Sequence, residues 1–258
     1  MLMINFILII LVACLYYLYT NNKSLETFDF EKIPTKYGDF VKDINISPEK
    51  GIPKIIHHIC PKDKGRWHDT WAPCLESWYK HFPEPEYKHM FWYDTELEEI
   101  VKSDYPWFLD VFRNYDVNIK RIDMVRPFFL YKYGGIYADM DYMCFKNFYD
   151  QLPADKVSTP ESPYKENEHI QNALLASPPR HNFWLLIMDE AYKNKDKPHV
   201  FTATGPRLYS DVYFKHPQLV NVLPMDIYNP HIADKDAFNS TTIVTKHLLS
   251  SVWTKNNK

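Results

Sequence analysis

Two adjacent glycines mark the point where a helical pattern in this chain gives way directly to a strand pattern. Residues 119–133 carry apolar side chains at helical spacing, Gly134-Gly135 stop the helix, and the next segment, "IYADMD", continues as a strand. Strand-like and helix-like segments also alternate on the N-terminal side of this point. Such alternation predicts an α/β layer with a mostly parallel sheet.

The same patterns give the other expected elements. We expect strands at Pro53–Ile59 and 86–94, and helices at 71–82, 96–102, 107–115 and 182–192. Pro127 lies inside the helix expected over 119–133, so that helix either bends there or begins later. After Phe148 the chain is richer in proline, with one clear helix. We therefore predict a single domain over residues 52–258.

The N-terminal segment Leu2–Tyr19 carries no formal charge and predicts a transmembrane helix. As a helix it would be ~27 Å long, close to the hydrocarbon thickness of a bilayer. A cleaved signal peptide and a lipoprotein box ending at Cys14 are the alternatives. We assign residues 1–20 to a single-pass membrane anchor and 21–51 to a stem. The anchor would place the protein in a Golgi-like or other endomembrane of a eukaryote, or in a host membrane for a virus.

Composition excludes several classes of function. The net charge is −3 with acids and bases mixed along the chain, so no basic stripe is present and nucleic acid is not an expected partner. Outside the anchor, Cys60, Cys74 and Cys144 form no C-x-x-C pair, which excludes a zinc knuckle or thioredoxin motif. We expect these cysteines to be free, buried thiols.

Asp139 and Asp141 come at the end of the strand that follows the glycines. Ligands of open α/β sheets collect at the carboxyl ends of strands. On an extended chain the two side chains point to the same face, so both carboxylates can approach one cation. Oxygen ligands suit Mg²⁺ or Mn²⁺, whose shells substrate phosphates commonly complete. The alternative is a solvated turn.

Asp123 and Arg126 lie one helical turn apart and therefore share one face of the helix expected over 119–133. An aspartate can accept hydrogen bonds from sugar hydroxyls, and an arginine can donate to them. The alternative is a surface ion pair within the helix, which would contribute little to stability. These residues and the two later aspartates together suggest a binding site.

Five segments follow one another along the chain: "IPKIIHHI", "RIDMVRPFFLYKYGGIYADMDY", "QNALLASPPRHNF", "TGP" and "HLLSSVW". In this order they resemble the DXD-containing sugar transferases of glycosyltransferase family 32, which includes initiating α-1,6-mannosyltransferases and inositol phosphorylceramide mannosyltransferases. The resemblance covers residues 52–253, and the D-x-x-R…GG-x-Y-x-D-x-D combination is its most specific part.

The resemblance implies a GT-A fold, Rossmann-like, and a retaining hexosyl transfer with Mn²⁺ or Mg²⁺. The donor would be a nucleotide-sugar, GDP-mannose or a UDP-hexose, with mannose favoured, and the acceptor a lipid or glycan. The implied site has a metal end, a sugar end and a nucleotide end. Asp141 would bind the metal directly, Asp139 would touch the ribose or the metal through water, and His247 would add a metal contact. Asp123 and Arg126 would hold the donor sugar. The nucleotide would contact Ile59, Tyr137, Ser251 and Trp253.

The chain departs from the family pattern at Cys60, where a tryptophan that can stack on the nucleobase is usual. Trp67 or Trp71 could supply that ring instead. The departure leaves open a non-catalytic, membrane-anchored, sugar-binding relative of the same fold. A phosphatase of the D-x-D-x-T type is disfavoured, because Met143 occupies the threonine position. No residue is marked by its spacing as a catalytic nucleophile or base.

Overall fold

The computed structural model describes residues 51–166, 168–234, 238 and 240–250. The anchor predicted for residues 1–20 lies outside this range, as does all but the last residue of the predicted stem. No helix among the described residues has both the length and the apolar character needed to cross a bilayer. Both N-terminal assignments therefore stay predictions.

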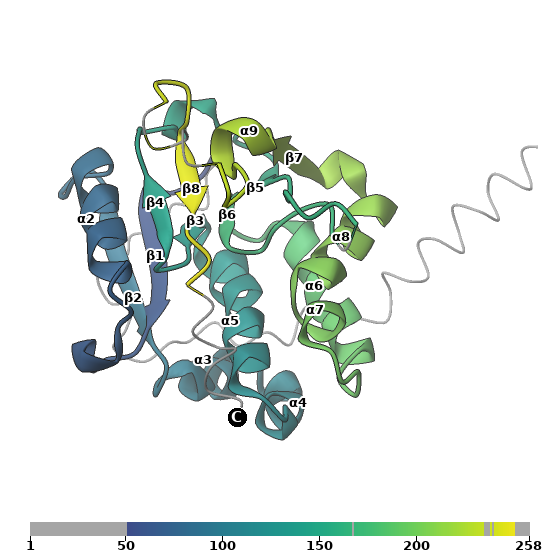
Figure 1. Ribbon diagram of the computed structural model, residues 1–258. Helices are drawn as coiled ribbons and strands as arrows, with labels where there is room; N and C mark the ends of the chain where they lie inside the picture. Colours follow the sequence, from purple (N-terminus) through teal and green to yellow (C-terminus); the bar gives the residue numbers. More distant parts are fainter. Residues whose placement is uncertain (1–50, 167, 235–237, 239, 251–258) are drawn as a thin grey trace, which may run out of the picture. The chain divides into compact units, whose positions relative to one another are not determined.

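A six-stranded mixed sheet forms the centre of the described domain (Figure 1). In spatial order its strands are β2 (Lys88–Tyr93), β1 (Ile55–Cys60), β3 (Gly135–Ala138), β6 (Leu174–Ser177), β5 (Val157–Pro160) and β7 (Val220–Leu223). Strand β1 is parallel to β2 and β3, and β5 is parallel to β7. Strand β6 is antiparallel to both of its neighbours.

The prediction of a mostly parallel sheet is therefore only partly correct. Strand β6 begins where β3 ends, because Ala138 pairs with Leu174. The backbone N–H of Asp139 also donates to the carbonyl of Ala173 at 2.9 Å. A chain that returns to the same end of its neighbour has to run antiparallel to it.

A second, two-stranded sheet joins β4 (Tyr142–Cys144) to β8 (Thr245–His247). The predicted strand "IYADMD" is thus too long, because β3 stops at Ala138. The carbonyl of Asp139 accepts from the N–H of Tyr142 at 2.9 Å, which closes a turn between β3 and β4. The antiparallel pairing brings the C-terminal segment to this turn, with Tyr142 opposite His247.

The helices predicted before Phe148 and the one helix predicted after it, at 182–192, begin and end close to their predicted limits. They are α2 (Trp71–His81), α3 (Leu97–Asp104), α4 (Leu109–Asn114), α5 (Asn118–Tyr133) and α6 (Asn182–Lys193). Three further helices were not predicted: α7 (Val200–Ala203), α8 (Pro206–Lys215) and α9 (Met225–Tyr228). Two of these span four residues, too few for a helical period to be visible in sequence.

Every residue of β1 is buried. Because successive side chains of a strand point to opposite sides, both faces of β1 are covered. On one face Ile56 joins the core formed with Trp78 of α2. On the other face His57 stacks on Phe129 of α5, with ring centroids 4.9 Å apart. The sheet is therefore covered by α2 on one face and by α5 on the other. Cys60, Cys74 and Cys144 are free and buried, as expected.

Helix α5 runs through Pro127 without a break, so the alternative of a later start is wrong. It ends at Tyr133 and is capped by Gly134, whose φ is +61°. A Cβ there would lie 2.7 Å from the backbone nitrogen of Pro179, and one at Gly135 would lie 2.7 Å from the carbonyl oxygen of Ile55. These close approaches and the positive φ angles require glycine at both positions. The pair joins α5 to β3 tightly and so fixes the helix beside the turn that carries Asp139 and Asp141.

Candidate functional site

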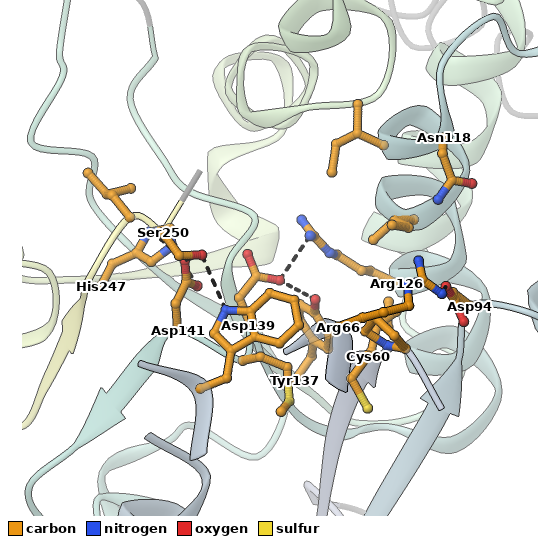
Figure 2. A pocket seen from close by; sticks show the side chains of 17 residues that line it. Cys60, Arg66, Asp94, Asn118, Arg126, Tyr137, Asp139, Asp141, His247 and Ser250 are labelled. Atoms are coloured by element: carbon orange, nitrogen blue, oxygen red, sulfur yellow. Dashed lines mark hydrogen bonds and ion pairs between the residues drawn. The ribbon is translucent and has the colours of Figure 1, made fainter. Parts of the chain in front are cut away.

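A cavity of about 480 Å³ opens at the carboxyl ends of β1 and β3 (Figure 2). Ile59 and Cys60 line it from β1, and Tyr137 lines it from β3. Arg126 reaches it from α5, and His247 reaches it from β8. Segments far apart in the sequence thus meet in one place, as expected for a ligand site in an open α/β sheet.

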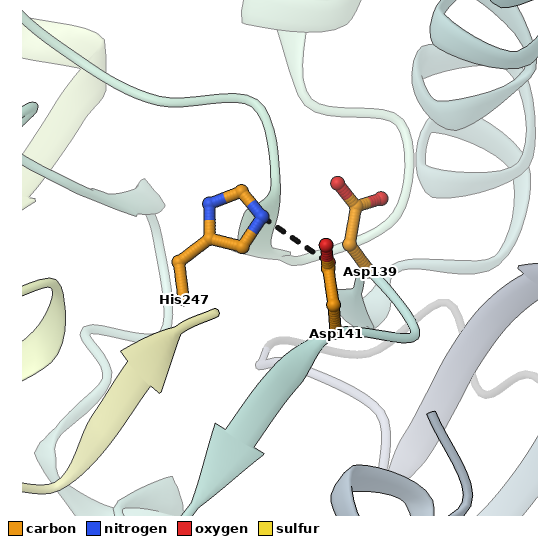
Figure 3. Close-up of side chains that lie close together, drawn as sticks. All are labelled: Asp139, Asp141 and His247. Atoms are coloured by element: carbon orange, nitrogen blue, oxygen red, sulfur yellow. Dashed lines mark hydrogen bonds and ion pairs between the residues drawn. The ribbon is translucent and has the colours of Figure 1, made fainter. Parts of the chain in front are cut away.

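Asp139 and Asp141 lie in the turn between β3 and β4 rather than on an extended strand. The prediction that extended geometry aligns their side chains is therefore wrong, but the turn brings both carboxylates to the cavity. They converge there with His247 (Figure 3). One ligand atom from each of the three residues lies within 4.8 Å of the others.

Asp141 has the denser set of hydrogen-bond donors of the two aspartates. His247 Nε2 lies 3.1 Å from Oδ1, while the backbone N–H and the hydroxyl of Ser250 each donate to Oδ2 at 2.7 Å. Burial raises the pKa of Asp141, but the charge of His247 and these hydrogen bonds outweigh it and hold the pKa below its usual range. Asp141 is therefore ionised at neutral pH.

The partner histidine is held in place by its own packing. The His247 ring stacks on Tyr142 with centroids 5.0 Å apart, and the two residues are paired across β4 and β8. Burial lowers the pKa of His247, but the carboxylates of Asp141 and Asp139 together raise it by more, so that the pKa ends above its ordinary value.

Arg126 connects the helix to the turn. Its guanidinium lies 2.9 Å from Asp123 Oδ1 and 2.9 Å from Asp139 Oδ1, donates to the carbonyl of Asn172 at 3.1 Å, and lies over the Tyr137 ring. The hydroxyl of Tyr137 donates to Asp139. The Arg126 and Asp123 side chains are only 5% and 6% exposed, so the alternative of a surface ion pair is wrong.

The carboxylate of Asp123 is held from three sides. Asn172 and Thr204 each donate to it at 3.2 Å, in addition to Arg126. Burial raises the pKa of Asp123 to about 7, although Arg126 opposes the shift. Burial also raises the pKa of Asp139, again against Arg126 and with the charge of Asp141 adding to the rise. The site thus collects more carboxylate than its arginine neutralises, which favours binding of a cation.

A second cavity, of about 870 Å³, adjoins the first one. Arg126, Asp139 and His247 line both cavities. Glu168 and Phe201 are among the residues that line the second cavity alone. The charged residues therefore stand between two spaces, an arrangement suited to two substrates that meet at one point.

Comparison with known proteins identifies the region that carries this site. Residues 68–159 match the family model described as a glycosyltransferase sugar-binding region containing the DXD motif. This region belongs to the DXD-containing glycosyltransferases. In this family region the DXD motif is Asp139-Met140-Asp141.

Two curated yeast proteins are among the relatives of the chain. It is 31% identical to mannosyl phosphorylinositol ceramide synthase SUR1 of Saccharomyces cerevisiae over 228 residues, which cover 82% of this chain and 54% of that protein. It is 30% identical to inositol phosphoceramide mannosyltransferase 2 of Schizosaccharomyces pombe over 202 residues, which cover 76% of this chain and 55% of that protein. The chain thus spans about half the length of these relatives.

The fold resembles that of solved glycosyltransferases. Mouse xyloside xylosyltransferase 1 superposes with a TM-score of 0.52 at 10% sequence identity, covering 76% of this chain and 98% of that protein. At so low an identity the similarity concerns the fold alone. The mixed α/β sheet is that of GT-A glycosyltransferases, as predicted.

The fold brings most of the predicted site residues together. Asp139, Asp141, Arg126, Ile59 and Tyr137 line the first cavity. Of the other predicted residues that the structure describes, His247 lines both cavities, and Asp123 lines the second cavity. Ser251 and Trp253 lie outside the described residues.

Other residues of the site were not predicted. Ser250 binds Asp141, and Asn172 and Thr204 bind Asp123. All three lie within or beside segments that carry the family resemblance, "HLLSSVW", "QNALLASPPRHNF" and "TGP", and this is the signal that could have found them. Nothing in their own spacing marks them.

The donor set of the DXD turn fits a divalent cation. Two carboxylates and one imidazole are ligands that Mn²⁺ and Mg²⁺ sites use, with the nitrogen favouring Mn²⁺. His247 Nδ1, the ring nitrogen that faces away from Asp141, has no hydrogen-bond partner among the described residues. The Nε2 atom, held beside Asp141, is the one placed to join the aspartates.

Proposed function

We propose that this chain is a metal-dependent, retaining hexosyltransferase that uses a nucleotide-sugar as its donor. The observation that carries the proposal is the convergence of Asp139, Asp141 and His247 on a cavity that Arg126 also lines, with Asp123, the buried partner of Arg126, lining the cavity next to it. A cluster of ligands beside a fixed guanidinium suits a diphosphate that bears a sugar.

The residues of the chain have separate tasks in this reaction. A bound Mn²⁺ or Mg²⁺ would neutralise charge that develops on the leaving nucleotide diphosphate. Asp141 and His247 would hold the ion, with Asp139 contacting it through water or contacting the ribose. Asp123 accepts hydrogen bonds from sugar hydroxyls, and Arg126 keeps Asp123 and Asp139 in fixed positions. The bond between the anomeric carbon and the diphosphate breaks, the oxygen of the acceptor hydroxyl bonds to that carbon from the same face, and the hydroxyl proton passes to the departing diphosphate. The anomeric configuration is thereby retained.

The names of the relatives support a choice of substrates. Relatives carry names that specify mannosyl transfer to inositol phosphoceramide. We therefore favour mannose as the sugar, GDP-mannose as the donor and a UDP-hexose as the second choice. The acceptor would be a lipid or a glycan that occupies the larger cavity. The N-terminal anchor predicted from sequence would hold the enzyme at the membrane that contains this acceptor.

A donor panel tests the proposal directly. The full chain is incubated with Mn²⁺ and GDP-mannose, UDP-galactose, UDP-glucose or UDP-N-acetylglucosamine, and both binding and release of nucleotide are measured. We expect one donor to bind and turn over, and Asp141→Ala or Asp139→Ala to reduce turnover by about 100-fold or more. Glu98→Gln, on α3 outside both cavities, is the matched carboxylate control and should be fully active.

Two results would contradict the proposal in different ways. An active Asp139→Ala, Asp141→Ala double variant would remove the metal assignment while leaving the transferase activity. If no donor binds and none is turned over, the result would favour a non-catalytic sugar-binding relative. Cys60 in the cavity wall lends support to that alternative.

A further inference from the structure

The DXD turn lies where the central sheet splits. Strand β1 stays paired with β2 as far as Cys60, opposite Tyr93, but its pairing with β3 ends at His57, opposite Tyr137. The first cavity opens at this split and is lined by Cys60 from β1 and by Asp139 from the turn. Beyond the split, the ladder of backbone hydrogen bonds between β1 and β3 no longer holds the two segments together. A side chain takes its place.

The imidazole of His58 spans the split. Its Nδ1 lies 3.0 Å from the carbonyl oxygen of Ala138, which is the last residue of β3 and precedes Asp139. Burial and, to a smaller degree, the proximity of His89 lower the pKa of His58 to about 3, so its ring is neutral at pH 7. A neutral imidazole carries a single N–H, and a carbonyl only accepts, so the proton is on Nδ1. His58 thus donates a hydrogen bond across the split to the residue before the DXD turn.

A second buried donor holds the other end of the turn. The indole Nε1 of Trp78, on α2, donates to the carbonyl of Tyr142 at 2.7 Å, and Tyr142 directly follows Asp141. The Tyr142 ring also supports His247, whose ring stacks on it. The rings of Trp78 and His58 meet edge to face with centroids 6.0 Å apart. The two side chains therefore form one buried unit, the turn clamp.

The turn clamp does not touch the space that a ligand would occupy. Neither His58 nor Trp78 lines either cavity, and both are buried. They can therefore act on the site only through the two backbone carbonyls that they bind. Those carbonyls flank Asp139 and Asp141, whose carboxylates converge with His247 (Figure 3). A hydrogen bond that fixes the backbone on either side of a ligand also fixes the direction of its side chain.

We propose that His58 and Trp78 are positioning residues that hold the DXD turn in the geometry that binds the divalent cation. The inference rests on the proposed metal-dependent function, and it concerns how the metal ligands are held rather than which residues they are. Removal of such an outer partner commonly weakens metal affinity by about 10- to 100-fold. Loss of either donor therefore weakens metal binding although every ligand is still present.

Titration of the full chain with Mn²⁺, followed by the electron paramagnetic resonance signal of free Mn²⁺, tests the proposal without relying on turnover. His58→Leu removes the donor and should raise the dissociation constant of Mn²⁺ by about tenfold or more. His58→Asn keeps an N–H at the place of Nδ1, because both nitrogens are bonded to Cγ, and should bind Mn²⁺ within about threefold of wild type. Trp78→Phe keeps a ring but not the indole N–H, and should resemble His58→Leu.

His89 supplies a matched control. It is buried, its ring stacks on His58 with centroids 6.0 Å apart, and its Nε2 lies 2.7 Å from the carbonyl of Phe82, at the end of α2. His89→Leu thus removes the same kind of hydrogen bond from a neighbouring ring without touching the DXD turn. It should lower the free energy of unfolding in urea, as His58→Leu does, but leave the dissociation constant of Mn²⁺ unchanged.

Three results would overturn the inference and leave the proposed function standing. These are wild-type Mn²⁺ affinity in His58→Leu and Trp78→Phe, a loss in His58→Asn as large as in His58→Leu, and an equal loss in His89→Leu. If His58→Leu does not fold, Trp78→Phe decides in its place. Absence of Mn²⁺ binding by the wild type would overturn the metal dependence in the proposed function, and this inference with it.

Discussion

Helix α5 contributes to two systems of buried ion pairs, and the two differ in how their charge is balanced. The Arg126 cluster consists of Asp123, Arg126 and Asp139 and lies against the cavities. The Lys132 pair consists of Asp104 and Lys132, whose Nζ lies 3.1 Å from both carboxylate oxygens. Neither member of the Lys132 pair lines either cavity.

The difference between the two systems separates a binding site from a structural contact. In the Lys132 pair one lysine faces one carboxylate, so the charge is balanced within the protein. In the Arg126 cluster one arginine serves two carboxylates, and Asp141 stands next to them. Uncompensated charge of this kind is costly unless a ligand neutralises it, which is why it concentrates at functional sites.

The largest effect is expected when the guanidinium of Arg126, which Asp123 and Asp139 share, is removed. Arg126→Met leaves two largely buried carboxylates without their partner, which should lower the free energy of unfolding by about 3 to 5 kcal/mol and abolish sugar transfer. Urea denaturation measures the loss. Arg126→Lys keeps the charge but not the planar fork that reaches both aspartates, so it should keep more of the stability while transfer stays low.

The pH dependence of this loss identifies its cause. Without Arg126, burial and the neighbouring Asp139 raise the pKa of Asp123 beyond its wild-type value of about 7. A raised carboxyl pKa stabilises the fold at low pH, where the group is protonated, and this contribution disappears as pH rises through the folded pKa. The Arg126→Met defect should therefore be larger at pH 8 than at pH 5. A defect that is equal at both pH values would indicate lost packing instead.

The second effect is stabilisation by the metal. Mn²⁺ at 100 times its dissociation constant should raise the free energy of unfolding by about 2.7 kcal/mol, because it binds only the folded site. Asp141→Asn should abolish this increase, and Lys132→Met should not alter it. A thermal melt with and without Mn²⁺ distinguishes the two variants. An equal increase in Asp141→Asn would place the ion somewhere other than the DXD turn.

The contrast between the halves of the chain shows what the sequence could predict about the fold. Before Phe148, α2, α5 and β1 are long enough for their periods to be visible, and they lie within a few residues of their predicted limits. After Phe148 the strands β5, β6 and β7 have four residues each. Segments this short show no clear period, and their pairing is set by neighbours remote in the sequence.

The same limit applies to the site. The Asp123 and Arg126 spacing predicted a shared helix face because both residues lie on one element. The contact of Arg126 with Asp139 and that of Ser250 with Asp141 depend on how separate elements pack, and no local pattern encodes them. Asp94, which lines the first cavity, was likewise not predicted, because its place beside Cys60 follows from the pairing of β1 with β2.

A smaller effect is expected for the Lys132 pair. Lys132→Met should destabilise the fold by about 1 to 2 kcal/mol, less than a fully buried pair would cost because the lysine is 21% exposed. Adding Asp104→Leu should recover most of the loss, since an apolar pair can replace a balanced ion pair. Turnover of the nucleotide-sugar should stay unchanged in both variants. A loss of turnover without a loss of stability would connect this pair to the active site.

The smallest effect concerns His57, a buried polar residue of β1 that stacks on Phe129 of α5 and stays neutral. Burial lowers the pKa of His57 to about 4, although its hydrogen bond with the carbonyl of Gly134 opposes the shift. The unfolded chain therefore binds a proton near pH 6.5 that the folded chain rejects, so stability is present above that pH and is lost as pH falls. Between pH 7 and pH 6, protonation of His57 in the unfolded chain lowers the free energy of unfolding by about 0.7 kcal/mol.

The His57 share is measured as a difference between variants, because buried carboxyls titrate in the same range with the opposite sign. Unfolding free energies of wild type and His57→Gln are compared at pH 7, 6 and 5, with His231→Gln at an exposed position as the control. The wild type should lose stability faster on acidification than His57→Gln, and as fast as His231→Gln. Parallel curves for wild type and His57→Gln would mean that the folded protein accepts the proton at His57, and that burial beside α5 does not by itself keep this ring neutral.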